Sequence, residues 1–269
     1  MIAIVGGGRM GRGLASVLSD AGERVVLWSR REARGAVSAA VSGAATVLLA
    51  VPDEAITDVA AELASEGAIE AGQVVLHLSG LLDARALHPL RRTGAALGSW
   101  HPLQSISEPA TAAERWRGAV AAVEGDSRAV TEACRLSRLL GLEPIGIAAG
   151  AKAAYHAGAV IASNYIVALA AMASRIAAAA GIPTKLAERM YLPLLLGAAE
   201  NLAHQSPAEA LTGPVRRGDL GTVRAHLEAL GPEDRSLYAR LGLETLAVAR
   251  TAGLEPARAD AMERVLRDY

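Results

Sequence analysis

Residues 1–14 read MIAIVGGGRMGRGL, and this stretch decides the fold. Four apolar residues, Ile2 to Val5, lead directly into the spacing Gly6-x-Gly8-x-x-Gly11, and an apolar helical pattern follows. The first glycine permits a tight turn, the second lets a diphosphate approach the backbone, and the third lets a helix pack close to the strand. The helix N-terminus adds free N–H groups and a positive dipole end. The stretch therefore predicts a strand–turn–helix unit that binds a dinucleotide, with contacts from Gly6, Gly8, Arg9, Met10 and Gly11.

The residues after the second predicted strand indicate which dinucleotide is bound. Residues 24–28 (RVVLW) predict this strand, and Ser29, Arg30 and Arg31 follow it. An acidic residue at this position binds the ribose 2′-hydroxyl of NAD, whereas arginine accommodates the 2′-phosphate of NADP. No acid stands here, so we expect NADP rather than NAD. The alternative is that the two arginines only begin a solvated helix.

Two later strands bring further candidate residues to the same edge of the sheet. Residues 45–51 (ATVLLAV) form a fully apolar run and predict a buried parallel strand that ends at Val51 and Pro52. Ligands bind at the carboxyl ends of the strands in such sheets, so Val51 and Pro52 are candidate cofactor contacts. A strand predicted over residues 95–99 is followed by His101 and Gln104, which are candidate substrate ligands. Alternatively, their loop only packs against the second half of the chain.

The alternation of strands and helices ends near residue 148. Up to that point the pattern predicts a mainly parallel sheet with helices on both faces. Beyond it the strand signals vanish, and helical runs are separated by glycine and proline. We therefore predict an α/β fold with two domains: a dinucleotide-binding domain over residues 1–148, and an all-helical substrate and dimerisation domain over residues 149–269.

The composition restricts the class of protein. The net charge of −1 argues against nucleic acid or an anionic membrane as the main partner. The single cysteine, Cys134, excludes an intrachain disulfide and a cysteine-based zinc site, and the 6 histidines show no metal-ligand spacing. We therefore expect no metal. Because the first strand begins at Ile2, we also expect no targeting segment and a cytoplasmic location.

One long apolar helix is predicted over residues 151–180. Its uncharged part, residues 155–174, is about long enough to span a membrane. It carries His156, Ser163 and Asn164, however, and a helix that is apolar on all sides is more often a soluble core or a dimer interface. The helical domain is too small to cover such a helix, so we expect no membrane and a homodimer through the helical domains.

Three motifs carry a resemblance to a known family: His101-Pro102-Leu103-Gln104-Ser105, the pair Tyr155-His156 with Asn164, and residues 211–219 (LTGPVRRGD). With the glycine turn and the Ala50-Val51-Pro52 loop, they make the chain similar to the 6-phosphogluconate dehydrogenase-like superfamily, which includes pyrroline-5-carboxylate and ketopantoate reductases. More closely, the chain resembles a bacterial family with a Rossmann-like domain and a C-terminal domain of unknown function. Its members are often labelled NADP-dependent oxidoreductases. The resemblance implies a Rossmann-type fold and a cofactor class, but no substrate.

The resemblance also suggests which residues move protons. Many members of the superfamily carry a lysine on the long helix and an asparagine later on it, and Asn164 matches that asparagine. His156 stands where the lysine is expected, and Lys152 lies one turn earlier on the same helix face. Either His156 is the acid/base, or Lys152 reaches over from its turn; the alternative is a buried histidine with a structural partner. Ser79, which ends a strand predicted over residues 73–78, is a candidate orienting group.

The motif over residues 211–219 is similar in position to the loop that holds the substrate carboxylate in pyrroline-5-carboxylate reductases. The hydroxyl pair of that loop is not reproduced here, and Arg216 is a candidate anion ligand in its place. The simpler role of Asp219 is to cap the next helix.

These observations lead to one hypothesis and one rival. The hypothesis is an NADP-dependent oxidoreductase that transfers a hydride between the nicotinamide and a small C=O or C=N substrate carrying a carboxylate. The rival is a non-catalytic dinucleotide-binding sensor or scaffold, and the departure at the lysine position motivates it.

Overall fold

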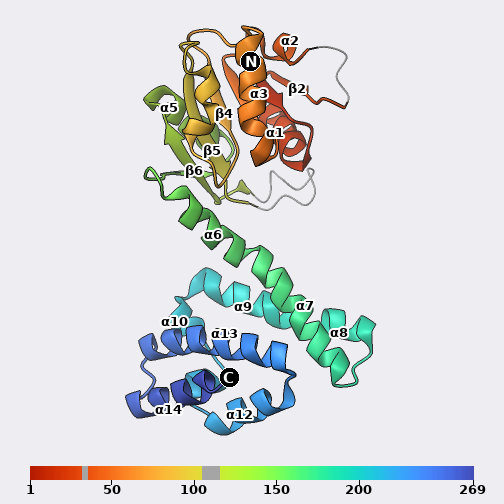
Figure 1. Ribbon diagram of the computed structural model, residues 1–269, viewed down its shortest axis with the longest axis vertical. Helices are drawn as coiled ribbons and strands as arrows, with labels where there is room; N and C mark the ends of the chain where they lie inside the picture. Colours follow the sequence, from red (N-terminus) through yellow and green to blue (C-terminus); the bar gives the residue numbers. More distant parts are fainter. Residues whose placement is uncertain (32–35, 105–115) are drawn as a thin grey trace. The chain divides into compact units, whose positions relative to one another are not determined.

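The computed structural model describes residues 1–31, 36–104 and 116–269. The chain divides into two compact units, Met1–Ser163 and Asn164–Tyr269 (Figure 1). The boundary therefore follows Ser163 rather than the predicted residue 148. The reason is that Lys152 and Tyr155, at the start of the helix after the sheet, form hydrogen bonds with residues of the sheet unit.

The first unit is built on one sheet. Within the described residues, seven strands pair in the order β2-β1-β3-β4-β5-β6-β7, and every neighbouring pair is parallel except β5 with β6. This confirms the predicted α/β fold with a mainly parallel sheet. The strands are β1 (Ile2–Val5), β2 (Val25–Trp28), β3 (Thr46–Leu49), β4 (Val74–His77), β5 (Ala96–Pro102), β6 (Val120–Gly125) and β7 (Glu143–Gly146).

Helices cover both faces of this sheet. The side chains of β1 alternate, so Ile2 and Ile4 enter one hydrophobic core and Ala3 and Val5 enter the other. The first core is closed by α1 (Arg9–Asp20) and α5 (Ser127–Leu139). The second is closed by α2 (Val37–Val41), α3 (Asp53–Ser65) and the 3-10 helix η1 (Ala84–Leu90). The two cores hold the carboxyl edge of the sheet rigid.

The second unit contains only helices among its described residues. They are α7 (Asn164–Ala179), α8 (Thr184–Met190), α9 (Leu192–His204), α10 (Pro207–Ala210), α11 (Pro214–Arg217), α12 (Leu220–Ala229), α13 (Pro232–Thr251) and α14 (Pro256–Arg267). Its core is formed mainly by α12, α13 and α14, around Val223, Leu246 and Met262. The second half of the chain is thus helical, as predicted.

The predicted long helix over residues 151–180 is interrupted. The helix α6 (Lys152–Ala162) ends at Ser163, and α7 begins at Asn164. The Ser163 hydroxyl donates a hydrogen bond to the carbonyl oxygen of Ala159, four residues earlier, and such bonds often bend helices. The irregular backbone of Ser163 follows from this local competition for the carbonyl.

Several helices of the second unit expose large apolar side chains. Val167 of α7 and Leu194 and Leu196 of α9 are 70%, 69% and 61% exposed. By length and composition, residues 152–179 could cross a membrane, with a mean hydropathy of 1.6 and 6% of the window buried. One such helix is weak evidence for a membrane span, because helices that pack against another protein chain share these properties.

Candidate functional site

The glycine turn joins β1 to α1, and each predicted glycine has a steric reason. Gly6 has a φ of +127°, and a Cβ there would overlap with the carbonyl oxygen of Ala50. A Cβ at Gly11 would overlap with the carbonyl oxygen of Gly6, so this glycine lets α1 approach the strand. Gly8 is different, because a Cβ there would meet nothing within 4 Å. The space above Gly8 and the first amides of α1 is therefore open to a ligand.

A cavity of about 540 Å³ lies beside this turn. It sits at the carboxyl ends of β1, β2 and β3, where the strand order reverses and where ligands bind in such sheets. The predicted residues that line it are Gly6, Gly8, Ser29, Arg30, Arg31, Val51 and Pro52. Arg12, which the sequence places close enough to add positive potential, also lines it, as do Gly7 and Trp28, which were not among the predicted contacts. Of the other predicted contacts, Arg9 is exposed, Met10 packs toward the core and Gly11 faces Gly6.

The rim of this cavity is positively charged. The Nε of Arg12 donates to the carbonyl oxygen of Gly7 at 2.9 Å, which fixes the guanidinium beside the turn. Arg30 contacts Glu62 at 3.2 Å, and its side chain is 75% exposed. An exposed ion pair contributes only about 0–1 kcal/mol, so a phosphate group can replace Glu62 as the partner of Arg30 at little cost.

A second group of polar side chains gathers at the ends of β4 and β5. Ser79 stands in the loop after β4, and its hydroxyl donates to Asp53 at 2.8 Å and accepts from the amides of Leu81 and Leu82. A serine hydroxyl has one donor and two acceptor positions, so these three bonds use all of them. Ser79 therefore shapes the loop, and its role as an orienting group stays a prediction.

Lys152 is buried in the same place, with only 3% of its surface exposed. Its ammonium group donates to the carbonyl oxygen of Ser79 at 2.6 Å and to the hydroxyl of Ser99. Burial lowers the Lys152 pKa to about 8, against the opposing effect of nearby carboxylates, the largest that of Glu124. The ammonium thus ties α6 to β5 and to the loop after β4, and it does not reach over to a neighbouring turn.

This burial predicts how stability changes with pH. The unfolded chain keeps the ordinary lysine pKa of 10.5, so between pH 8 and 10.5 it binds a proton that the folded protein has released. Stability must then rise with pH across this window. Relative to Lys152→Met, we expect the wild type to gain up to about 3 kcal/mol, measured by urea unfolding. A difference between the two proteins that stays constant from pH 8 to 10.5 would contradict this placement.

Two histidines and a tyrosine complete the group. The Nδ1 of His101 and the hydroxyl of Tyr155 share a hydrogen bond of 2.9 Å, and the His101 ring contacts the His156 ring edge to face. Burial, with the nearby Lys152 charge, lowers the pKa of His101 to about 4, so this imidazole is neutral at neutral pH. The Nδ1 of His156 is buried and has no hydrogen-bond partner among the described residues. The β5 strand runs to Pro102, so His101 lies within the strand rather than in a loop after it.

A third histidine, His77, has a structural role. Its Nε2 lies 3.0 Å from the carbonyl oxygen of Asp83, and its Nδ1 accepts from the amide of Ser79 at 3.2 Å. Burial lowers the pKa of His77 to about 4. Both ring nitrogens are used by the loop, so His77 stabilises the loop that carries Ser79.

The other predicted residues are placed elsewhere. Gln104 follows β5 in the first unit, and the next residue of its motif, Ser105, lies outside the described residues. Asn164 begins α7 in the second unit. Arg216 donates to the carbonyl oxygen of Ala252 at 2.9 Å, also in the second unit. The roles of Gln104, Asn164 and Arg216 therefore stay predictions from the sequence. No set of three or more potential metal ligands occurs among the described residues.

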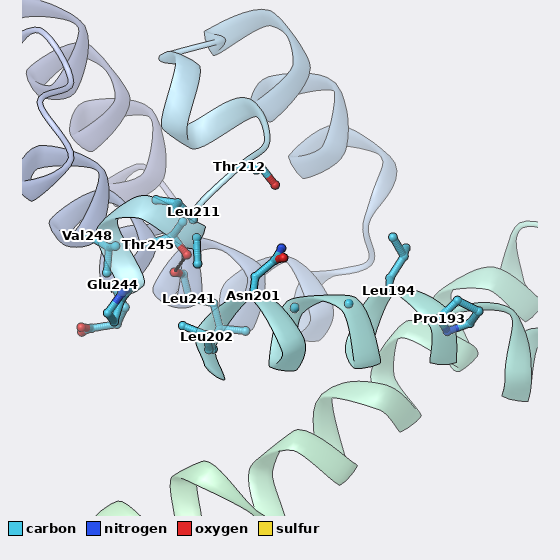
Figure 2. A pocket seen from close by; sticks show the side chains of 14 residues that line it. Pro193, Leu194, Asn201, Leu202, Leu211, Thr212, Leu241, Glu244, Thr245 and Val248 are labelled. Carbon is cyan, nitrogen blue, oxygen red and sulfur yellow. Dashed lines mark hydrogen bonds between the residues drawn. The ribbon is translucent and has the colours of Figure 1, made fainter. Parts of the chain in front are cut away.

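The second unit contains a cavity of its own, which the sequence did not indicate (Figure 2). It measures about 590 Å³ and lies among α9, α10 and α13. Its walls are mainly apolar, with Leu194, Leu211 and Val248 among them, and Asn201 and Thr212 are polar exceptions. A neighbouring depression is lined by Arg216, Arg217 and Arg258. These features can accept an apolar group and an anion respectively.

Comparison with known families agrees with this architecture. Residues 1–102 match the model of the Rossmann-like domain, and residues 119–245 match a domain of unknown function, DUF2520. The chain is thus similar to a Rossmann-like domain followed by a DUF2520 domain. This pair confirms the resemblance predicted from the sequence. The DUF2520 match begins at β6, so it includes α6 with Lys152 and His156 as well as most of the second unit.

Solved structures share the fold of this Rossmann-like and DUF2520 chain. Protein TM1727 from Thermotoga maritima is 25% identical, with a TM-score of 0.72 over 93% of this chain and 99% of that chain. A reductive aminase from Aspergillus terreus, solved with NADPH and ethyl levulinate, is 15% identical with a TM-score of 0.60 over 99% and 92%. A pyrroline-5-carboxylate reductase from Coxiella burnetii is 18% identical with a TM-score of 0.57 over 99% and 97%. No curated protein sequence matches the chain significantly.

Proposed function

We propose that this protein is an NADP-dependent oxidoreductase acting on a small C=O or C=N substrate that carries a carboxylate. The cavity beside the glycine turn carries the proposal, because it combines open helix amides with a rim of arginines at the strand-order reversal. The reductive aminase of the same fold was solved with NADPH, which supports this cofactor class. The nicotinamide would supply the hydride, and the protein would bind and orient both reactants.

The residues present fit NADP at both of its charged ends. The amides at the start of α1, with the open space at Gly8, suit the diphosphate. Arg30 and Arg31 on the cavity rim suit the 2′-phosphate, because guanidinium groups bind phosphate oxygens in pairs. Among the described residues, no acidic side chain lines the cavity. None of them is therefore placed to bind the ribose 2′-hydroxyl, as an acidic residue does in NAD sites.

For proton transfer we favour His156 over Lys152. The buried Nδ1 of His156 has no partner among the described residues, whereas the Lys152 ammonium is held by Ser79 and Ser99. His156 is therefore proposed as the acid/base group. Asn164 as an orienting group, His101 and Gln104 as substrate contacts, and Arg216 as a carboxylate ligand remain proposals from the sequence.

The double variant Arg30→Ala/Arg31→Ala tests the cofactor assignment. We expect NADPH binding to weaken about 10- to 100-fold, while NADH binding stays unchanged, because these exposed arginines together should contribute about as much as one charge-assisted hydrogen bond of 1.5–3 kcal/mol. Cofactor fluorescence titration measures both constants. The matched control is Arg91→Ala/Arg92→Ala, which removes the same charge from two exposed residues. These residues precede β5, so they lie toward the amino ends of the parallel strands, away from the cavity. Equal weakening by both double variants would contradict the assignment.

Turnover separates the enzyme from a non-catalytic sensor. The wild type, incubated with NADPH and a panel of oxo acids, imino acids and simple ketones, should oxidise NADPH with at least one of them. Absorbance at the nicotinamide band reports the reaction. NADPH binding without turnover on any member of the panel would favour the sensor, and no binding of either nicotinamide dinucleotide would exclude both.

We further propose a cytoplasmic homodimer formed through the helical unit. Large apolar side chains of α7 and α9 are exposed, and burying such side chains against a second copy is favourable. A membrane is the less suitable partner, because Lys152 and Tyr155 tie the start of the same apolar segment to the sheet. A monomer mass in light scattering at micromolar concentration would contradict the dimer.

A further inference from the structure

Gly80 lies in the loop after β4, next to the imidazole rings of His101 and His156. A Cβ at this position would overlap with Nδ1 of His156 and would lie 2.9 Å from both Cε1 and Nε2 of His101. The backbone of Gly80 does not require a glycine, since its φ is not among the positive values of the chain. What requires a glycine is the space that the two imidazoles occupy.

The two ring nitrogens therefore converge on one point. Both Nδ1 of His156 and Nε2 of His101 lie close to the missing Cβ, and their distances from it limit their separation to at most about 5.3 Å. Within this limit, one atom held beside Gly80 can lie at hydrogen-bond distance from both nitrogens. A buried nitrogen without a hydrogen-bond partner is unfavourable, so a group that bonds to Nδ1 of His156 at this point stabilises the site.

A hydrogen bond at its other ring nitrogen fixes the orientation of His101. The Tyr155 hydroxyl occupies Nδ1 of His101, which leaves Nε2 as the ring nitrogen that faces His156 and Gly80. The charged and titratable groups that influence His101 are Lys152, His156, Asp53 and His77. Lys152 and His77 are fixed by the loop after β4, and Asp53 is bound by Ser79. The surroundings of the pair are thus built from residues that already have partners.

We propose that His101 and His156 hold the reacting oxygen or nitrogen of the substrate between them, and that Gly80 is the positioning residue that allows this. The inference rests on the proposed function. In the reducing direction, the substrate carbon would gain the hydride that a bound NADPH supplies, and its C=O or C=N π bond would break. His156 Nδ1 gives its proton to the oxygen or nitrogen and is left as neutral imidazole. His101 stays neutral throughout and hydrogen-bonds the same atom through Nε2.

Gly80→Ala tests the inference, with Gly158→Ala as its matched control. Gly158 lies on α6 two residues after His156, and a Cβ there would meet nothing within 4 Å. Long-range ¹H–¹⁵N spectra of the imidazoles, recorded without substrate, report the two rings directly. We expect Gly80→Ala to shift the Nδ1 signal of His156 and the Nε2 signal of His101, and Gly158→Ala to shift neither. Tyr155→Phe, which removes one hydroxyl, should shift both signals through His101.

Turnover gives the second measurement. On a substrate from the carbonyl panel, Gly80→Ala should lower kcat at least tenfold with an unchanged Kd for NADPH, and Gly158→Ala should change neither. Unchanged imidazole signals in both Gly80→Ala and Tyr155→Phe would overturn the inference, whatever happens to turnover. So would a Gly80→Ala protein with shifted signals but undiminished kcat. Loss of NADPH binding by the wild type would instead contradict the proposed function, and the spectra would still judge the pairing of the histidines.

Discussion

Gly8→Val is expected to weaken NADPH binding by about a factor of 10² to 10⁴ while leaving the fold intact. The Gly8 backbone is extended, with φ −72° and ψ −177°, and a Cβ there meets no atom within 4 Å. Valine therefore fits the folded protein, with a cost of about 1 kcal/mol at a helix N-cap. It does not fit beside a diphosphate on the α1 amides, and losing two charge-assisted hydrogen bonds of about 1.5–3 kcal/mol each gives the stated range.

Gly11→Ala should instead affect the stability of the fold. A Cβ at Gly11 overlaps with the carbonyl oxygen of Gly6, so this variant should lose stability through the packing of α1 on β1. Thermal unfolding and NADPH titration on both variants separate the two effects. A Gly8→Val protein that binds NADPH as tightly as the wild type would show that no diphosphate lies on this turn.

His156→Ala is expected to lower kcat by about 10² to 10⁴, the usual contribution of a general acid or base, with an unchanged Kd for NADPH. His156 lies on α6, outside the residues that line the cofactor cavity, so its loss should not affect dinucleotide binding. Because the buried Nδ1 has no hydrogen-bond partner among the described residues, its removal leaves no other polar group unpaired, and the fold should tolerate the change. Steady-state kinetics on a substrate from the panel give kcat, and fluorescence titration gives Kd.

His88→Ala is the matched control for this variant. His88 is an exposed histidine of η1, so its replacement removes the same side chain without touching the candidate site. Undiminished turnover by His156→Ala would remove the histidine from the mechanism. A large loss in both histidine variants would indicate a general loss of folded protein, which circular dichroism would detect.

The sequence predicts most of the residues around the cavity beside the glycine turn. The glycine spacing, the apolar strands and the arginines after β2 are local signals, because each depends on residues a few positions apart. The cavity indeed contains Gly6, Gly8, Arg30 and Pro52. Trp28 could not be predicted as a lining residue, because it reaches the cavity from a strand end whose direction only the fold shows.

The proton-transfer group could be predicted only in part. His156, Lys152 and His101 were all candidates from the sequence, but their distinct roles depend on hydrogen bonds between residues far apart in the chain. Lys152 bonds to Ser79, which lies 73 residues earlier. No local sequence pattern shows that the ammonium of Lys152 has two hydrogen-bond partners while Nδ1 of His156, on the same helix, has none among the described residues.

The amino-acid sequence by itself thus determined the fold class, the glycine turn and the positive charge beside it, since these follow from backbone geometry and from neighbouring residues. Only the tertiary structure decided that Ser79 and Lys152 serve the loop and that Gly80 leaves room for two imidazoles. The physical reason is that burial and hydrogen-bond partners are properties of packed neighbours, and packing joins β4, β5 and α6 from separate parts of the chain.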